Sequence, residues 1–349
     1  MATETVVIGS RTVGAGQPCF VVAEAGVNHD GDPQRAHALV DAAADAGADG
    51  VKFQAFRTGE LAAAAAALAP YQRTTGARTQ DDLLRALELD GETFRALALH
   101  ARDRELVFLA SAFDTASVDL LDDSGVDAYK IASPDVANPL LLEAVGSHGR
   151  PVILSTGTAD LAEVEAALTT LRRAGSEDLV VLQCTSAYPA PADEANLRAM
   201  ATMREAFGVP VGFSDHTAGD EVALAAVALG ACVLEKHLTL DRSLPGPDHA
   251  ASLEPEEFAL LVERVRTVES ALGDGVKRPT ASEEENARVV RRSLAAATDL
   301  AAGTKLERSM LTALRPGTGI PAARIGDVVG RRLRRSVATH ELLDPDDLE

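Results

Sequence analysis

The feature that most constrains the fold of this chain is a repeat in which a short apolar run is followed by a helical segment. The runs are apolar at consecutive positions, which is typical of strands buried on both faces of a parallel sheet. Eight such units in about 260 residues predict an α/β fold, the (β/α)8 TIM barrel. A doubly wound sheet is the alternative, but no G-x-G-x-x-G turn follows the first run. The predicted strands are Cys19–Ala23, Gly50–Phe53, Leu106–Ala110, Ala128–Ile131, Val152–Leu154, Leu179–Leu182, Val209–Phe213 and Cys232–Leu234.

The segments between these runs carry helix signals. Pro33–Ala46 follows a capping Asp32 and has proline at its first position. Leu161–Ala174 and Asp220–Leu229 are amphipathic, and Glu254–Leu272 is predicted to be the last barrel helix.

The domain organisation follows from these elements. We predict that residues 1–278 form the barrel, beginning with a short hairpin lid, that residues 279–290 form a polar linker, and that residues 291–349 form a second unit. The second unit is predicted to have short strands and Gly/Pro turns. After the second barrel strand, an alanine-rich run over 61–70 and a polar run over 74–82 predict either an active-site lid or solvent-exposed padding.

Composition limits the partners and the compartment. The net charge of −20 argues against nucleic acid, and no apolar run approaches the ~20 residues that span a bilayer. The N-terminus lacks the basic start and apolar core of a signal peptide. Cys19, Cys184 and Cys232 all lie in apolar runs, which predicts reduced core thiols in a cytoplasmic protein.

The charge is unevenly distributed along the chain. From Arg288 to the C-terminus there are 11 Lys or Arg and 8 Asp or Glu, so the excess negative charge lies in the preceding part. This asymmetry suggests two units with different surfaces that face each other.

Two histidines stand at the ends of neighbouring predicted strands. His216 lies in the stretch Val211–Thr217 and His237 lies in its echo Val233–Thr239, each where an apolar run gives way to polar residues. Imidazoles that converge at one rim of a barrel suit a divalent metal ion such as Mn, Fe, Co or Zn. The alternative is that one or both are loop histidines with structural partners.

Two lysines lie inside apolar strand runs, where a charge is costly unless it is paired or binds an anion. With the Ser and Thr hydroxyls at the strand ends, Lys52 and Lys130 predict a clamp for phosphate and carboxylate. A structural ion pair is the alternative for either lysine. The residues themselves therefore predict a small phosphorylated substrate beside a divalent metal.

Several stretches together closely resemble the sialic acid synthase family. In the barrel they are Ala23–Gly31, Gly50–Gln54, Tyr129–Ser133, Leu154–Gly157, Phe213–Thr217, Glu235–Asp241 and Gly246–His249. In the second unit Arg292–Leu294 and Leu314–Pro321 resemble the family's antifreeze-like (SAF) domain. The resemblance implies a TIM barrel joined to a β-clip type domain, a domain-swapped homodimer, and a divalent metal on His216 and His237. The metal is most often Mn, with Mg, Co or another ion as alternatives.

The resemblance also implies a reaction and roles for residues. Phosphoenolpyruvate (PEP) would condense with a sugar aldehyde to give a nonulosonic acid and phosphate, through metal-activated attack and C–O cleavage. Glu24 and Asp135 would handle a proton or orient water. Gln54, Tyr188, Asp248 and, from the partner subunit, Arg315 would contact the acceptor. PEP would be held by Lys52, Ser111, Lys130, Ser133, Ser155, Ser186 and Ser214.

Three positions depart from the commonest pattern of the family. Ser111-Ala-Phe113 replaces Thr-Pro-Phe, Asp135 stands where Glu is common, and Ser186 replaces Asn. The last two lie where acceptor and PEP would meet. The acceptor therefore stays open between N-acetylmannosamine, a 2,4-diacetamido-trideoxy hexose and an unusual aldose.

Two other classes of protein compete with this interpretation. A metal-dependent barrel hydrolase or sugar isomerase usually has a third or fourth metal ligand and does not need two anion-binding lysines. A carbohydrate-binding protein without activity would not need the full set of polar residues at the strand ends.

Overall fold

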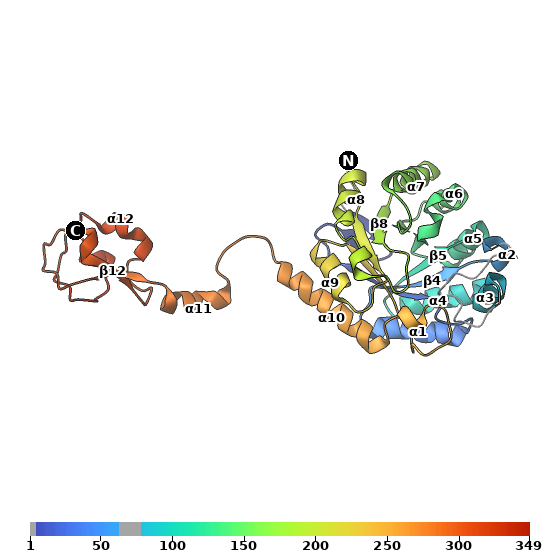
Figure 1. The fold of residues 1–349 in the computed structure, drawn as a ribbon, viewed down its shortest axis with the longest axis horizontal. Helices are drawn as coiled ribbons and strands as arrows, with labels where there is room; N and C mark the ends of the chain where they lie inside the picture. The colour runs from blue at the N-terminus through green and yellow to red at the C-terminus, as the bar shows by residue number, and fades with distance from the viewer. Residues whose placement is uncertain (1–4, 63–77) are drawn as a thin grey trace. The chain divides into compact units, whose positions relative to one another are not determined.

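The computed structural model describes residues 5–62 and 78–349 and divides the chain into two units (Figure 1). The boundary between them in the sequence lies between Gly273 and Asp274. The predicted lid or padding lies partly outside the described residues. Its described ends belong to helices α2 (Thr58–Leu61) and α3 (Gln80–Leu87). No helix of the described part is long and apolar enough to cross a membrane, and the cytoplasmic location stays a prediction.

The first unit is a closed parallel barrel, as predicted. Within the described residues eight strands pair in the order β10-β3-β4-β5-β6-β7-β8-β9, so that the last strand lies beside the first. The strands are β3 (Phe20–Gly26), β4 (Gly50–Ala55), β5 (Val107–Ala112), β6 (Ala128–Ile131), β7 (Val152–Ser155), β8 (Leu179–Cys184), β9 (Val211–Asp215) and β10 (Val233–His237). Each contains or overlaps one of the predicted apolar runs.

Helices cover the outside of the barrel (Figure 1). The first begins after Asp32, whose side chain accepts a hydrogen bond from the Gln34 backbone N–H, and α7 begins with a capping box of Asp160 and Glu163. Besides α2 and α3, the helices are α1 (Pro33–Asp45), α4 (Gly91–Asp103), α5 (Thr115–Ser124), α6 (Pro139–Ser147), α7 (Leu161–Ala174), α8 (Ala199–Phe207), α9 (Glu221–Ala228) and α10 (Pro255–Leu272).

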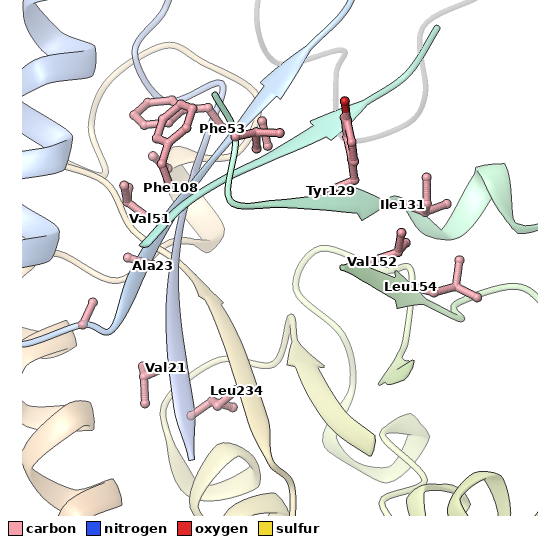
Figure 2. Packing of buried hydrophobic residues seen from close by; sticks show 14 of the residues in the cluster. Val21, Ala23, Val51, Phe53, Phe108, Tyr129, Ile131, Val152, Leu154 and Leu234 are labelled. Carbon is pink, nitrogen blue, oxygen red and sulfur yellow. The ribbon is translucent and has the colours of Figure 1, made fainter. Parts of the chain in front are cut away.

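Alternate residues of the strands build two different cores. Outward-facing side chains such as Val51, Phe53 and Phe108 pack in the layer between strands and helices, and Figure 2 shows part of this layer. Inside the barrel, Phe20, Val107, Val233 and their neighbours fill the N-terminal ends of the strands.

The predicted hairpin is present and closes the N-terminal end of the barrel. It consists of β1 (Thr5–Ile8) and β2 (Arg11–Gly14), and its Val6, Ile8 and Val13 join the inner apolar cluster. The polar residues at the C-terminal strand ends are thereby left at the opposite, open end. The three cysteines are buried and free, as predicted.

The second unit has its own apolar core, which includes Leu294, Leu306, Leu333, Val337 and Leu343. Its elements are α11 (Ala281–Val290), β11 (Ser293–Ala296), β12 (Leu311–Leu314) and α12 (Ile325–Val328). The predicted linker is thus largely helical. A capping box of Thr280 and Glu283 starts this helix directly after Pro279, where a proline does not interrupt helical hydrogen bonds.

Candidate active site

The C-terminal ends of the barrel strands surround a pocket of about 430 Å³. Topology explains this convergence, because parallel strands in a closed barrel end at the same rim. The pocket brings together every residue predicted for the site except Arg315, which belongs to the second unit. It is lined by Glu24, Lys52, Gln54, Ser111, Lys130, Ser133, Asp135, Ser155, Ser186, Tyr188, Ser214, His216, His237 and Asp248. The structure gives their positions, and their roles stay predictions.

Lys52 and Lys130 lie at the bottom of the pocket and are almost fully buried. The Lys52 ammonium is 2.8 Å from Glu24 Oε2 and donates to Ser111 Oγ at 3.1 Å. Lys130 donates to Ser155 Oγ at 2.7 Å. Both lysines therefore have partners within the protein, as the structural alternative requires, and their binding of an anion stays a prediction.

Glu235 lies between the two lysines. Its carboxylate is 3.7 Å from Lys52 Nζ and 3.6 Å from Lys130 Nζ, and it accepts a hydrogen bond from Ser214 Oγ at 3.0 Å. Burial alone would raise the pKa of Glu235, but the two ammonium groups outweigh burial and lower it to about 2. Glu235 is thus a fixed negative charge that helps to keep both lysines in the barrel.

The two lysines differ in their electrostatic environment. Burial lowers the pKa of each ammonium, but Glu235 and Glu24 together reverse this for Lys52 and hold its pKa above the ordinary value. For Lys130, burial dominates and the pKa lies below the ordinary value, since Glu235 offsets it only in part. Lys130 therefore has more to gain from a bound anion.

The backbone at Gly157 lies close to the hydroxyl groups of Ser133 and Ser186, which line the pocket. The Gly157 N–H donates to Ser133 Oγ at 3.0 Å. A Cβ at Gly157 would lie only 2.3 Å from Ser186 Oγ and 2.9 Å from Ser133 Oγ. Only glycine fits at this position while both hydroxyls stay at the pocket.

His216 and His237 stand side by side at the rim, with ring centroids 5.4 Å apart. The ring of Tyr188 lies next to both, at 4.3 Å from His216 and 5.8 Å from His237. The His216 Nδ1–H donates to the carbonyl oxygen of Thr185 at 2.7 Å, because a carbonyl can only accept. The Nε2 lone pair of His216 is then available to a ligand.

The arrangement of the imidazoles fits a divalent metal ion. His237 is buried, and its Nδ1 has no hydrogen-bond partner among the described residues. Burial holds the pKa of His237 well below its ordinary value, so that the ring is neutral as a metal ligand must be. No group of three or more His, Cys, Asp or Glu side chains in the described residues is arranged as a metal site. Two imidazoles would then bind the ion together with water or substrate oxygens.

The predicted acceptor residues lie toward the same rim. Gln54 Nε2 donates to Glu24 Oε1 at 2.9 Å, and Asp248 Oδ2 is 4.0 Å from His237 Nδ1. Burial raises the pKa of Asp248 to about 6 and also raises the pKa of Asp135, whose Oδ1 accepts from Asn138 at 3.1 Å. These side chains provide several hydrogen-bonding groups above the two lysines.

One side of the pocket is apolar, which sequence reasoning missed. Val27, Phe56, Leu83 and Leu87 form a separate buried cluster, against which Leu61, Leu84 and Phe113 pack. All seven side chains line the pocket. We call them the apolar wall. The only sequence signal for it is the leucine spacing of Gln80–Leu87, because the other members come from four separate segments.

Comparison with known proteins identifies the family of the chain. Residues 39–277 match the model of the NeuB family. The chain belongs to the NeuB family. Residues 291–349 match the SAF domain, so the predicted resemblance is confirmed for both units.

Several relatives of this NeuB-family chain are named as synthases. The N,N'-diacetyllegionaminic acid synthase of Campylobacter jejuni is 43% identical over 328 residues, which cover 93% of this chain and 98% of that protein. The enzyme of the same name from Legionella pneumophila is 42% identical, with 97% of each chain covered. The crystal structure of the N-acetylneuraminic acid synthetase from Leptospira borgpetersenii superposes with a TM-score of 0.73 at 37% identity, over 81% of this chain and 95% of that one. These findings confirm the predicted class of enzyme, a PEP-dependent condensing synthase.

Two further pocket residues of this NeuB-family chain had no predicted role. Glu235 stands in the stretch Glu235-Lys-His237, and the period of two along a strand places it on the same face as His237. Cys184 lies beneath His216, with Sγ at 3.8 Å from Nδ1, and accepts from Ser133 Oγ at 3.6 Å. The spacing was a usable signal for Glu235, whereas a cysteine in an apolar run gives none.

Proposed function

We propose that this chain joins PEP to the aldehyde carbon of an N-acylated amino sugar, with release of phosphate. The observation that carries the proposal is one pocket with two buried lysines and a ring of hydroxyls at its bottom and two imidazoles at its rim. A sugar hydrolase or isomerase does not need two anion-binding lysines. An enzyme whose substrate carries both a phosphate and a carboxylate does need such groups.

PEP would bind at the bottom of the pocket. Its phosphate and carboxylate would accept hydrogen bonds from Lys52, Lys130 and the neighbouring hydroxyls, which are Ser111, Ser133, Ser155, Ser186 and Ser214. Charge-assisted hydrogen bonds in a buried site are strong because water does not compete for them. Glu235 would keep the lysines in place before PEP binds.

His216 and His237 would hold a divalent metal ion, for which we propose Mn²⁺. A bound ion of this kind would polarise the carbonyl oxygen of the acceptor. The support is that His216 donates through Nδ1, which leaves Nε2 as the nitrogen that can bind a ligand, and that the Nδ1 of His237 lacks a partner among the described residues.

The proposed reaction balances as follows. The C2=C3 π electrons of PEP form a bond from C3 to the aldehyde carbon, and the aldehyde oxygen takes up a proton. Water adds to C2 and loses one proton to Glu24 or Asp135. The C2–O bond to phosphate then breaks as the new C2 hydroxyl gives its proton to the departing phosphate and becomes the keto oxygen. The products are a 3-deoxy-2-keto acid and inorganic phosphate. Positioning and charge neutralisation by the residues of the clamp would be the main contributions to the rate.

For the acceptor we propose a 2,4-diacylamino-6-deoxy hexose. Two relatives above 40% identity are named as synthases of a product with two acetyl groups. The apolar wall supports the same choice, since Phe56, Leu84 and Leu87 can bury methyl groups but leave hydroxyls without partners.

The test is an incubation of the protein with PEP, Mn²⁺ and one acceptor at a time. The acceptors are 2,4-diacetamido-2,4,6-trideoxymannose, N-acetylmannosamine and mannose. We expect phosphate and a keto acid only when an acceptor is present, with the highest kcat/KM for the diacetamido sugar. Phosphate release without an acceptor, or isomerisation of a sugar without PEP, would contradict the proposal.

We further propose that the chain works as a domain-swapped homodimer, in which Arg315 of one subunit contacts the acceptor in the barrel of the other. The support is the charge asymmetry of the chain and the family's pattern around Leu314–Pro321.

A further inference from the structure

A second buried lysine–carboxylate pair lies directly behind the two imidazoles. Lys236 of β10 and Asp215 of β9 are partners in the strand register, and Lys236 Nζ is 2.7 Å from Asp215 Oδ2. The two side chains are only 1% and 0% exposed. Neither lines the pocket, whereas their neighbours Ser214, His216, Glu235 and His237 do. The pair therefore lies on the outer face of the strands.

A third residue, Thr217, forms hydrogen bonds with both members of the pair. Lys236 Nζ also donates to the carbonyl oxygen of Thr217 at 2.6 Å. Asp215 Oδ1 accepts from the Thr217 backbone N–H at 2.9 Å and from its hydroxyl at 2.8 Å. Two side chains thus hold the backbone of Thr217, the residue that directly follows His216.

The contacts form three successive rungs between β9 and β10. In the first, Ser214 and Glu235 meet on the inner face, and in the second Asp215 and Lys236 meet on the outer face. The third rung is the pair His216 and His237 on the inner face, with His216 one residue beyond the end of β9. Because consecutive residues of a strand are rigidly joined, a bond in the second rung limits the separation of the rings in the third.

We propose that Lys236 and Asp215 are a positioning pair that sets the distance between the imidazoles and thereby the affinity for the divalent cation. This rests on the metal site of the proposed function. Supporting residues outside the ligand shell commonly contribute 10- to 100-fold to metal affinity. A pair that serves stability alone would leave this affinity unchanged.

The experiment measures Mn²⁺ binding directly, from the loss of the electron paramagnetic resonance signal of free Mn²⁺, with unfolding curves in parallel. The variants are Lys236→Met, Asp215→Asn and the double variant Asp215→Leu/Lys236→Met. The double variant replaces the whole pair by apolar groups, which commonly preserves stability. We expect Mn²⁺ affinity to fall on the order of 10-fold in all three variants. The double variant should show this loss while its unfolding curve stays close to that of the wild-type protein.

Arg266→Met is the matched control, because the Arg266 guanidinium pairs with Asp49 at 2.6 Å near the start of β3, away from the pocket. It should lower stability and leave Mn²⁺ affinity unchanged. Wild-type affinity in the folded double variant, or an equal loss in Arg266→Met, would overturn the positioning role alone. Failure of the wild-type protein to bind Mn²⁺ would overturn the metal assignment and this role with it.

Discussion

Buried lysines on the inner and outer faces of the same barrel have different surroundings. On the inner face, Lys52 and Lys130 share Glu235 at 3.6 to 3.7 Å and border a pocket. On the outer face, Lys236 is bound at 2.6 to 2.7 Å by Asp215 and Thr217 and does not line the pocket at the strand ends. The inner lysines can therefore turn toward a ligand, while the ammonium group of the outer lysine binds two partners within the protein.

This difference shows why residue type alone does not indicate function. The stretch Glu235-Lys-His237 contributes to both faces within three residues, and only the alternation along the strand separates them. Changes on the inner face should alter the chemistry, and changes on the outer face should alter stability and geometry.

The largest effect is expected at the rim of the inner face. His216→Ala or His237→Ala should abolish condensation, because a single imidazole would be left to hold the metal ion. Unfolding curves should shift little, since neither ring is part of the apolar core. Chelators should have the same effect on the wild-type protein, reversibly. Full activity of the double variant His216→Ala/His237→Ala would show that the metal site is wrongly assigned.

The next effect is expected at the inner lysines. Lys52→Met or Lys130→Met should weaken PEP binding by about 2 kcal/mol or more, roughly 30-fold, because a charge-assisted contact in a buried site is lost. Lys236→Met is the outer-face control and should instead lower the free energy of unfolding by about 3 kcal/mol, since Asp215 is left unpaired. Calorimetric PEP titrations and urea unfolding distinguish these results. If the inner variants bound PEP normally and only the affinity for the sugar changed, the clamp would be misassigned.

A smaller effect is expected from the second unit. Arg315→Ala should raise the KM for the acceptor or lower kcat, with little change in PEP binding, since we assign this guanidinium to the acceptor. Mixing it with His216→Ala subunits tests the swapped dimer, because a heterodimer would contain one intact site. Activity should partly return when both parents are inactive. No recovery despite proven subunit exchange would mean that Arg315 does not act on the partner's barrel.

The smallest effect at neutral pH is expected for His29, a buried histidine away from the pocket. Burial lowers the pKa of His29 to about 4, and its Nδ1 accepts from the Gly31 N–H at 3.0 Å, which requires the neutral ring. Between about pH 6.5 and 4 the unfolded chain takes up a proton that the folded chain does not, so stability falls over this range. His29→Gln should reduce this pH dependence in urea unfolding measured at pH 7 and pH 5. An unchanged slope would show that other groups cause it.

Much of the barrel was predictable because its strands are buried on both faces and therefore appear as continuous apolar runs. The rim was predictable for the same reason, since polar residues that interrupt such runs must lie at strand ends. The ion pairs of Glu235 with two lysines were not predictable, because they depend on which strands face one another across the inside of the barrel. The apolar wall was missed because Val27, Phe56 and Phe113 are far apart in the sequence.

The second unit was harder to predict in detail. Its short strands were expected, but α11 was taken for a linker because its exposed residues are polar and Pro279 precedes them. The capping pair Thr280 and Glu283 is the signal that indicates the helix. The predicted role of Arg315 depends on a second chain, which the fold of one chain does not determine.

The most direct test of the proposed condensation follows the bridging oxygen of PEP. With ¹⁸O between C2 and phosphorus, the reaction with Mn²⁺ and the diacetamido sugar should release phosphate that carries the label, because the C2–O bond breaks. Mass spectrometry of the phosphate and of the keto acid gives the answer. Unlabelled phosphate, or labelled phosphate in equal amount without an acceptor, would contradict a condensation at C3 of PEP in this pocket.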